Sequence, residues 1–175
     1  MKPHALPLLL AGLLVATAAH ASAADHVHAS HAWIRVLPGD LPAGAYVTLQ
    51  NDGEQPVALN GARSKTYAEV MLHHSSNAGG MSRMTMVDAL TVPAHGNAVL
   101  APAGYHLMLM KAATPVKPGD TVQLTLTFTD GSTLATDFIA RPANTVDAGD
   151  DQAKPAHAMS AMGTMDHAAM PHVGH

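Results

Sequence analysis

Histidine and methionine, whose side chains can bind metal ions, are both abundant in this sequence. The 175 residues include 13 His and 11 Met, beside 1 Trp, 3 Tyr, 2 Phe and no Cys. Imidazole nitrogen and thioether sulfur bind soft and borderline transition metals. The lack of cysteine excludes disulfides, iron–sulfur clusters, cysteine-ligated zinc and a thiol nucleophile from the given sequence. The composition therefore points to metal handling.

Four of these residues have a spacing that could form one metal site. His73 and Met84 are separated by ten residues, Met84 and His106 by twenty-one, and His106 and Met108 by one. Because side chains alternate along a strand, His106 and Met108 project to one face. The polar, glycine-containing stretch 75–80 predicts a hairpin that brings His73 and Met84 towards the same end of the fold. Taken singly, each Met also suits core packing and each His an ordinary strand or loop position.

The elements that must position these residues are predicted to be β-strands. Short apolar runs are separated by Pro, Gly, Asn and Asp, and no stretch shows a sustained helical pattern. Residues 121–129 alternate Thr or Gln with apolar side chains, which predicts a strand with one buried face. Many short strands favour an all-β fold, either an antiparallel sandwich or a small barrel. The predicted strands are residues 32–37, 45–51, 57–62, 69–75, 81–87, 97–100, 105–111, 121–129 and 133–139.

The first two dozen residues are typical of a secretory signal peptide. Lys2 precedes an apolar run at 6–16, and the small residues Ala21, Ser22 and Ala23 follow it. The run is too short to span a bilayer. We predict cleavage after Ala23 and location in the periplasm, with an uncleaved anchor or a buried helix as the alternative. The predicted parts are a signal peptide at 1–23, a folded domain at 24–145 and a tail at 146–175.

The C-terminal segment has a composition unlike the rest of the chain. Residues 147–175 contain no Leu, Ile, Phe, Trp or Tyr, so they lack the apolar surface that offsets the entropy of ordering. We predict a flexible tail that carries potential metal ligands, although a solvated tail with incidental His and Met is the alternative. Its eight candidate ligands are His157, Met159, Met162, Met165, His167, Met170, His172 and His175.

Cleavage after Ala23 would create a second candidate site at the new N-terminus. Ala24, Asp25 and His26 would then supply a free amine, two backbone amides and an imidazole, a set of four nitrogens that suits square-planar Cu(II) or Ni(II). His28 lies nearby. The alternative is a set of incidental histidines, and cleavage one residue later would destroy the chelate.

The spacing and its context resemble the PCu(A)C family of periplasmic copper chaperones. The family hallmark of His, ten residues, Met, twenty-one residues, His, one residue, Met is matched by His73, Met84, His106 and Met108. The resemblance covers about residues 29–141 and extends to the flanking segments Ala43-Gly44-Ala45-Tyr46, Val70-Met71-Leu72-His73, Val92-Pro93-Ala94, Gly104-Tyr105-His106-Leu107-Met108-Leu109-Met110 and Gly119-Asp120-Thr121-Val122. It implies a cupredoxin-like sandwich that binds Cu(I) through the four hallmark side chains and passes copper to oxidase assembly. It also implies Cu(II) capacity in the tail.

The residues near the hallmark methionine leave one alternative open. Met81 and Met86 lie close to Met84 in the sequence, and Met81 could exchange with Met84 as a ligand. We expect Met71, Met86 and Met110 to lie in the core or behind the ligands, His74 to point to the opposite face from His73, and His95 to occupy a turn.

Ligand chemistry supports a carrier of Cu(I). Two imidazoles and two thioethers suit a soft d10 ion without imposing the square-planar field that Cu(II) prefers, and a neutral set would release copper to a partner that offers cysteines. Blue-copper electron transfer requires a cysteine, which the sequence lacks. The expected partner is the copper-receiving oxidase subunit or a thiol-bearing relay protein. Periplasmic copper buffering or resistance is the alternative function.

Charge and motif content argue against other classes of protein. The net charge of -4 and the absence of a Lys/Arg run offer no footprint for nucleic acid or anionic lipid, and we expect no membrane insertion after signal cleavage. The sequence shows no Ser/His/Asp set, paired carboxylates or phosphate-binding loop, so we do not expect an enzyme. A monomer is expected, with a metal-bridged dimer left open.

Overall fold

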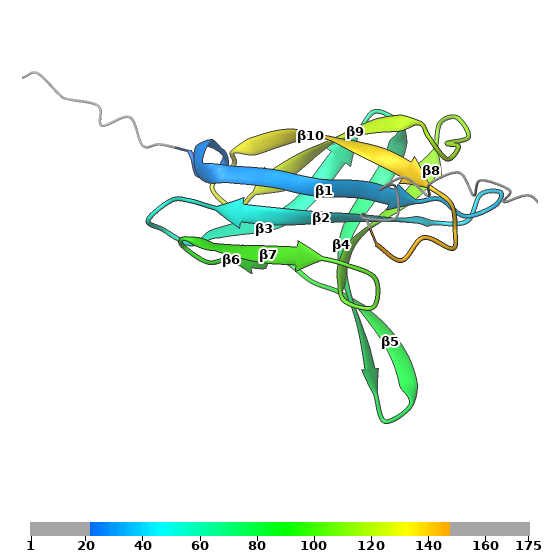
Figure 1. Cartoon of the computed structure of the whole chain (residues 1–175), viewed down its shortest axis with the longest axis horizontal. Helices are drawn as coiled ribbons and strands as arrows, with labels where there is room; N and C mark the ends of the chain where they lie inside the picture. The colour runs from blue at the N-terminus through cyan, green and yellow to red at the C-terminus, as the bar shows by residue number, and fades with distance from the viewer. Residues whose placement is uncertain (1–21, 148–175) are drawn as a thin grey trace, which may run out of the picture.

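The computed structural model describes residues 22–147 as a fold built almost entirely of β-strands (Figure 1). A single 3-10 turn, η1 (Ala23–His26), precedes the first strand. The strands are β1 (Val27–Arg35), β2 (Ala43–Asn51), β3 (Val57–Ser64), β4 (Tyr67–Ala78), β5 (Met81–Met86), β6 (Leu90–Val92), β7 (Gly96–Leu100), β8 (Tyr105–Ala112), β9 (Thr121–Phe128) and β10 (Thr133–Arg141).

The strands form one continuous hydrogen-bonded sheet that wraps around the core. Its order is β5-β4-β8-β2-β1-β10-β9-β3-β6, with β7 paired to β2 beyond the stretch that pairs β8. All pairings are antiparallel except that of β1 with β10, which is parallel. This pairing joins the strands nearest the two ends of the described chain. It is the one departure from the antiparallel arrangement that the sequence predicts, because pairing between distant strands leaves no local pattern.

Alternation along the strands builds the core, as the sequence predicts. In β9, Val122, Leu124, Leu126 and Phe128 are all buried while the intervening polar residues face outward. Buried side chains from strands throughout the sheet pack together in one hydrophobic core. The other fully buried large side chains are Ile34, Val47, Leu49, Leu59, Val92, Leu100, Leu107, Leu109 and Phe138.

The predicted strands agree with the observed ones except at a few boundaries and in one element. Strand β1 begins at Val27, five residues before its predicted start, and β4 continues to Ala78. Strand β6 was not predicted. It contains three residues paired with β3, which is too short for alternation to be visible in the sequence.

Strand β5 and the end of β4 form a hairpin that projects from the body of the fold (Figure 1). In the described part of the chain, β5 pairs with β4 alone, and every residue of β5 is exposed. Two bonds hold the base of the hairpin: Ser75 N donates to Gly104 O and Val87 N donates to Leu72 O, each at 3.0 Å. The hairpin therefore carries its methionines out from the core without a second strand to cover them.

Two predicted segments lie outside the described residues. The signal peptide predicted at 1–23 falls almost wholly before residue 22, and the His/Met-rich segment falls largely after residue 147. The signal peptide, the domain boundaries at 24 and 145, and the tail remain predictions. No helix among residues 22–147 is long and apolar enough to cross a membrane.

Candidate metal centre

The two hallmark histidines are cross-strand partners on one face of the sheet. His73 of β4 lies directly opposite His106 of β8, and their ring centroids are 5.9 Å apart with the rings at 75°. Directly opposite residues of an antiparallel pair project to the same face. Because Leu72 and Leu107 point into the core, this face is the outer one. The resemblance to the PCu(A)C family implied that these two imidazoles lie close together.

His106 is held in an orientation that suits a metal ligand. The residue is 6% exposed, and its Nδ1 lies 3.1 Å from the carbonyl oxygen of Gly104. When Nδ1–H donates this bond, Nε2 keeps the lone pair that a metal can accept. Burial lowers the pKa of His106 below its ordinary value, the Gly104 bond opposes that shift, and nearby His73 and Arg35 favour the neutral ring. The imidazole is therefore neutral, as metal binding requires.

His73 has a buried nitrogen without a partner. Its Nδ1 is inaccessible to solvent and makes no hydrogen bond with the described residues. A buried polar atom that makes no bond costs free energy, which a ligand at that atom would recover. The orphaned nitrogen lies beside the neutral His106 ring, so the two imidazoles offer two nitrogen donors at one place.

The two hallmark methionines lie on the same face but at different distances from the histidine pair. Met108 is half-buried, two residues from His106 along β8 and opposite Met71 of β4. Met84 is 50% exposed on the projecting hairpin, opposite Ser75. The structure thus brings Met108 next to the histidines and leaves Met84 on the same face farther along the hairpin, and the complete ligand set remains a prediction.

The other methionines of the hairpin are both exposed, and they face opposite ways. Met86 is 68% exposed and lies directly opposite His73, so it is not a core residue, which was one of the two positions expected for it. Met81 is 70% exposed and, being three residues from Met84 on the same strand, projects to the other face. His74 also projects to that other face, where its ring lies 4.4 Å from the ring of Tyr105. His95 occupies a turn, as predicted.

An aromatic layer that the sequence reasoning did not single out supports His106. Tyr46 of β2 is buried, and its ring centroid is 6.3 Å from that of His106 and 4.5 Å from that of Trp33. Arg35 donates a hydrogen bond of 2.7 Å to the Tyr46 hydroxyl, and its guanidinium lies 5.4 Å from the ring centre. Burial raises the pKa of Tyr46, so the hydroxyl stays protonated.

Gly44 makes room for this aromatic layer. A Cβ at Gly44 would lie 2.6 Å from Oη of Tyr46 and 3.0 Å from its Cζ. The Tyr46 ring therefore covers the backbone of β2 at the point where Gly44 pairs with Met108. Gly44 and Tyr46 both belong to the motif Ala43-Gly44-Ala45-Tyr46, which is part of the resemblance, and their close approach gives that motif a structural reason.

The predicted N-terminal site has a different arrangement in the structure. His26 Nδ1 lies 3.4 Å from one carboxylate oxygen of Asp52, and His28 Nε2 lies 3.0 Å from the other. The hydrogen bond from His28 lowers the pKa of Asp52. The backbone N–H of Ala24 donates to Ser132 Oγ. These groups have protein partners here, and in residues 22–147 no group of three or more His, Asp or Glu is arranged to hold a metal ion.

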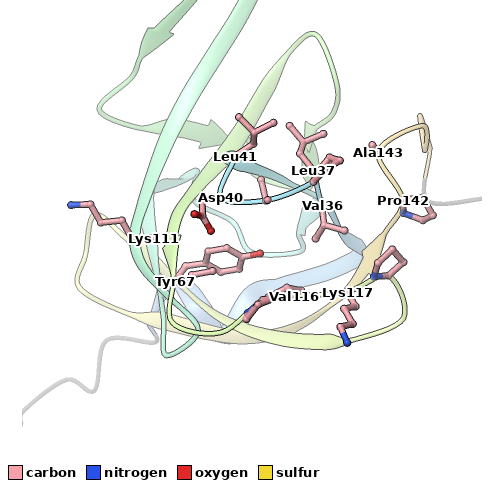
Figure 2. A pocket seen from close by; sticks show the side chains of 16 residues that line it. Val36, Leu37, Asp40, Leu41, Tyr67, Lys111, Val116, Lys117, Pro142 and Ala143 are labelled. Atoms are coloured by element: carbon pink, nitrogen blue, oxygen red, sulfur yellow. The ribbon is translucent and has the colours of Figure 1, made fainter.

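A pocket lies at the other end of β4 and β8 (Figure 2). It has a volume of about 790 Å³ and is walled by Tyr67 at the start of β4, Lys111 near the end of β8, and the loop that contains Leu37 and Leu41. None of its lining residues is a candidate metal ligand. The candidate metal centre is therefore a surface feature of the β5-β4-β8 face and does not belong to this pocket.

Comparison with known proteins assigns the family. Residues 27–140 match the family described as "LpqE-like: Putative lipoprotein LpqE-like". The chain belongs to this family. A curated relative, the "Putative lipoprotein Lxx21020" of Leifsonia xyli subsp. xyli, is 32% identical over 111 residues, which is 63% of this chain and 66% of that protein. The match therefore spans slightly less than two thirds of the relative.

Solved structures confirm the fold and the resemblance to PCu(A)C domains. The solution structure of CuI-DR1885 from Deinococcus radiodurans is 36% identical, with a TM-score of 0.56, and the match covers 73% of this chain and 85% of that one. The copper-bound PCuAC domain from PmoF2 has a TM-score of 0.57 at 23% identity, with 70% and 98% covered, and it supports the fold alone. The LpqE-like chain has the cupredoxin-like β-fold that the resemblance implied.

Proposed function

We propose that this LpqE-like chain is a copper carrier that binds Cu(I) on the β5-β4-β8 face. The observation that carries the proposal is the buried, unpartnered Nδ1 of His73 beside the neutral ring of His106. Met108 adds a half-buried thioether on the same face. The Cu(I) form of the related DR1885 protein supports copper as the metal.

The proposed ligand set is His73, Met84, His106 and Met108. Met84 completes it when the hairpin bends towards the histidines, because Met84 already faces the same side of the sheet. Thioethers and imidazoles are neutral, so they bind the soft Cu(I) ion without a thiolate. A partner that offers cysteine thiolates binds the ion more strongly, and transfer therefore runs towards that partner.

We propose that the protein works in the periplasm after export. The support is the signal-like segment at residues 1–23 and the description of the family as putative lipoproteins. The given sequence contains no cysteine to carry an S-linked lipid. We propose that cleavage after Ala23 produces the mature carrier.

The proposed destination is the binuclear copper centre of cytochrome oxidase, reached through the receiving oxidase subunit or a thiol-bearing relay protein. The competing function is periplasmic copper buffering or resistance, which is favoured by the eight His and Met residues between 157 and 175. In that segment we propose additional binding of copper, including Cu(II). A role as a redox enzyme would require turnover of oxygen and reductant, and we propose none.

A deletion strain separates delivery from buffering. Loss of a carrier starves the oxidase of metal, so we predict low oxidase activity that added copper restores. The measurement is oxidase activity and growth across a copper series, with the wild-type gene returned as the control. Copper sensitivity with normal oxidase activity would instead assign the protein to buffering.

Substitution of the proposed ligands tests the site itself. We predict that Met84→Ala combined with Met108→Ala lowers Cu(I) affinity at least tenfold, because the ion loses two sulfur donors. His106→Ala has a similar or larger effect. The measurement is competition with a colorimetric Cu(I) chelator, and Met81→Ala on the opposite face is the matched control. Unchanged affinity in every variant would contradict the site.

A further inference from the structure

We infer that Met86 is a further Cu(I) ligand, able to take the place of Met84 on the same ion. This inference deepens the proposed function and rests on it. Met86 lies directly opposite His73 in β5, and His106 lies directly opposite His73 in β8. A thioether and two imidazoles therefore form one row across three neighbouring strands.

Position along the hairpin favours Met86 as the nearer sulfur. Directly opposite residues have Cβ atoms about 4.5–5.5 Å apart, whereas diagonal neighbours are about 7–8 Å apart. Met86 is the direct partner of His73, and Met84 is a diagonal neighbour because it pairs with Ser75. With the hairpin extended, the sulfur that His73 meets first belongs to Met86.

The distance from each hairpin methionine to Met108 also favours Met86. Met108 pairs with Met71, two residues along β4 from His73 on the side away from the hairpin tip. Strand spacing and rise place Met84 about 17 Å from Met108 along the sheet, but Met86 about 12 Å from it. A common ion requires both sulfurs within bonding distance, so Met86 needs the smaller movement of the hairpin.

Exposure makes the exchange between the two sulfurs feasible. Met84 is 50% exposed and Met86 is 68% exposed, and within residues 22–147 no strand pairs with the outer edge of β5. If both thioethers can reach the same Cu(I) ion, one sulfur can bind the ion as the other dissociates from it. The pair would retain copper while the hairpin moves between its extended and bent positions.

Met81 provides the matched control. It lies on the same strand and is 70% exposed, but it is three residues from Met84 and projects to the opposite face. Substitution by Leu keeps the side chain apolar and similar in volume while it removes the sulfur. Met81→Leu therefore tests whether any exposed hairpin sulfur suffices.

The test uses the full chain with its methionine methyl groups labelled with carbon-13. Cu(I) is buffered by a chelator, and occupancy of the face is read from the Met108 methyl signal, so copper in the segment 148–175 does not count. We expect Met84→Leu to weaken binding by less than tenfold and to leave a Cu(I)-dependent shift of the Met86 methyl. The Met84→Leu, Met86→Leu double variant is expected to lose at least a further tenfold, and the Met84→Leu, Met81→Leu variant to match Met84→Leu.

The outcomes separate the inference from the proposed function. If Met84→Leu binds as weakly as its double variant with Met86→Leu, and the Met86 methyl never responds to Cu(I), Met86 is not a ligand while the carrier function stands. If wild-type protein shows no Cu(I)-dependent change at Met108, His73 or His106, the proposed function fails and the inference fails with it.

Discussion

At the scale of the residue, one backbone carbonyl organises the histidine pair. Gly104 O accepts a hydrogen bond from His106 Nδ1 at 3.1 Å and another from Ser75 N at 3.0 Å. When Nδ1 donates this bond, the same carbonyl leaves the lone pair on Nε2 of His106, and it also holds the base of the hairpin two residues beyond His73. The tight turn before β8 places it there, through the bond from Gly104 N to Ala101 O. The spacing of residues in the sequence identifies the candidate ligands, but it does not identify the role of the Gly104 carbonyl.

Gly44 offers a direct test of the aromatic layer behind His106. In Gly44→Ala the added Cβ would lie only 2.6 Å from Oη of Tyr46, which is a steric clash. We therefore predict that the substitution lowers the free energy of unfolding by about 1–3 kcal/mol. Urea denaturation measures the change. Tyr46→Phe removes the hydroxyl oxygen, the atom nearest to the added Cβ. In that background Gly44→Ala should lower the free energy of unfolding by a smaller amount. An equal cost in both backgrounds would show that Tyr46 and Gly44 do not conflict.

At the scale of the element, the β4–β5 hairpin differs from the strands that form the core. β8 is paired on both sides, by β4 and β2, whereas β5 has a neighbour on one side only. None of the β5 residues is buried, so little apolar contact holds the strand in place. The hairpin is therefore the part of the metal face that can move most easily when an ion binds.

Hydrogen exchange tests this difference between the strands. We predict that the backbone amides of β5 exchange much faster than those of β8 in the copper-free protein, because local opening of β5 breaks few contacts. Addition of Cu(I) should slow exchange in β5 and leave the core strand β9 unchanged. Mass spectrometry of peptides after timed exchange gives both values. Equal protection of β5 and β8 without copper would contradict a mobile hairpin.

The sequence predicts these elements well where the pattern is local. Short apolar runs separated by Pro, Gly, Asn and Asp located nine of the ten strands in the described residues, and the stretch 75–80 predicted the hairpin between β4 and β5. It did not locate β6, which has three residues. It also did not indicate that Met86 faces His73, since that position depends on the pairing register and not on spacing along one strand.

At the scale of the whole molecule, the fold places the proposed copper-binding face at one end of the sheet order, on β8, β4 and β5. The strands nearest the two ends of the described chain, β1 and β10, pair in the middle of that order and run parallel. The hallmark residues came from their spacing and from the resemblance to a known family, and their role as ligands stays a prediction. The parallel pairing of β1 with β10 and the Tyr46 layer could not be predicted, because both depend on contacts between residues distant in the sequence or on burial.

The central claim is that Cu(I) binds on this face through imidazole nitrogen and thioether sulfur together. X-ray absorption of Cu(I) bound at one equivalent to protein lacking residues 148–175 tests it most directly, because the His and Met residues of the removed segment then contribute no ligands. We predict a first shell of both nitrogen and sulfur neighbours, with fewer sulfurs after Met108→Ala. A shell of nitrogen or oxygen alone, or a spectrum that Met108→Ala leaves unchanged, would contradict the account.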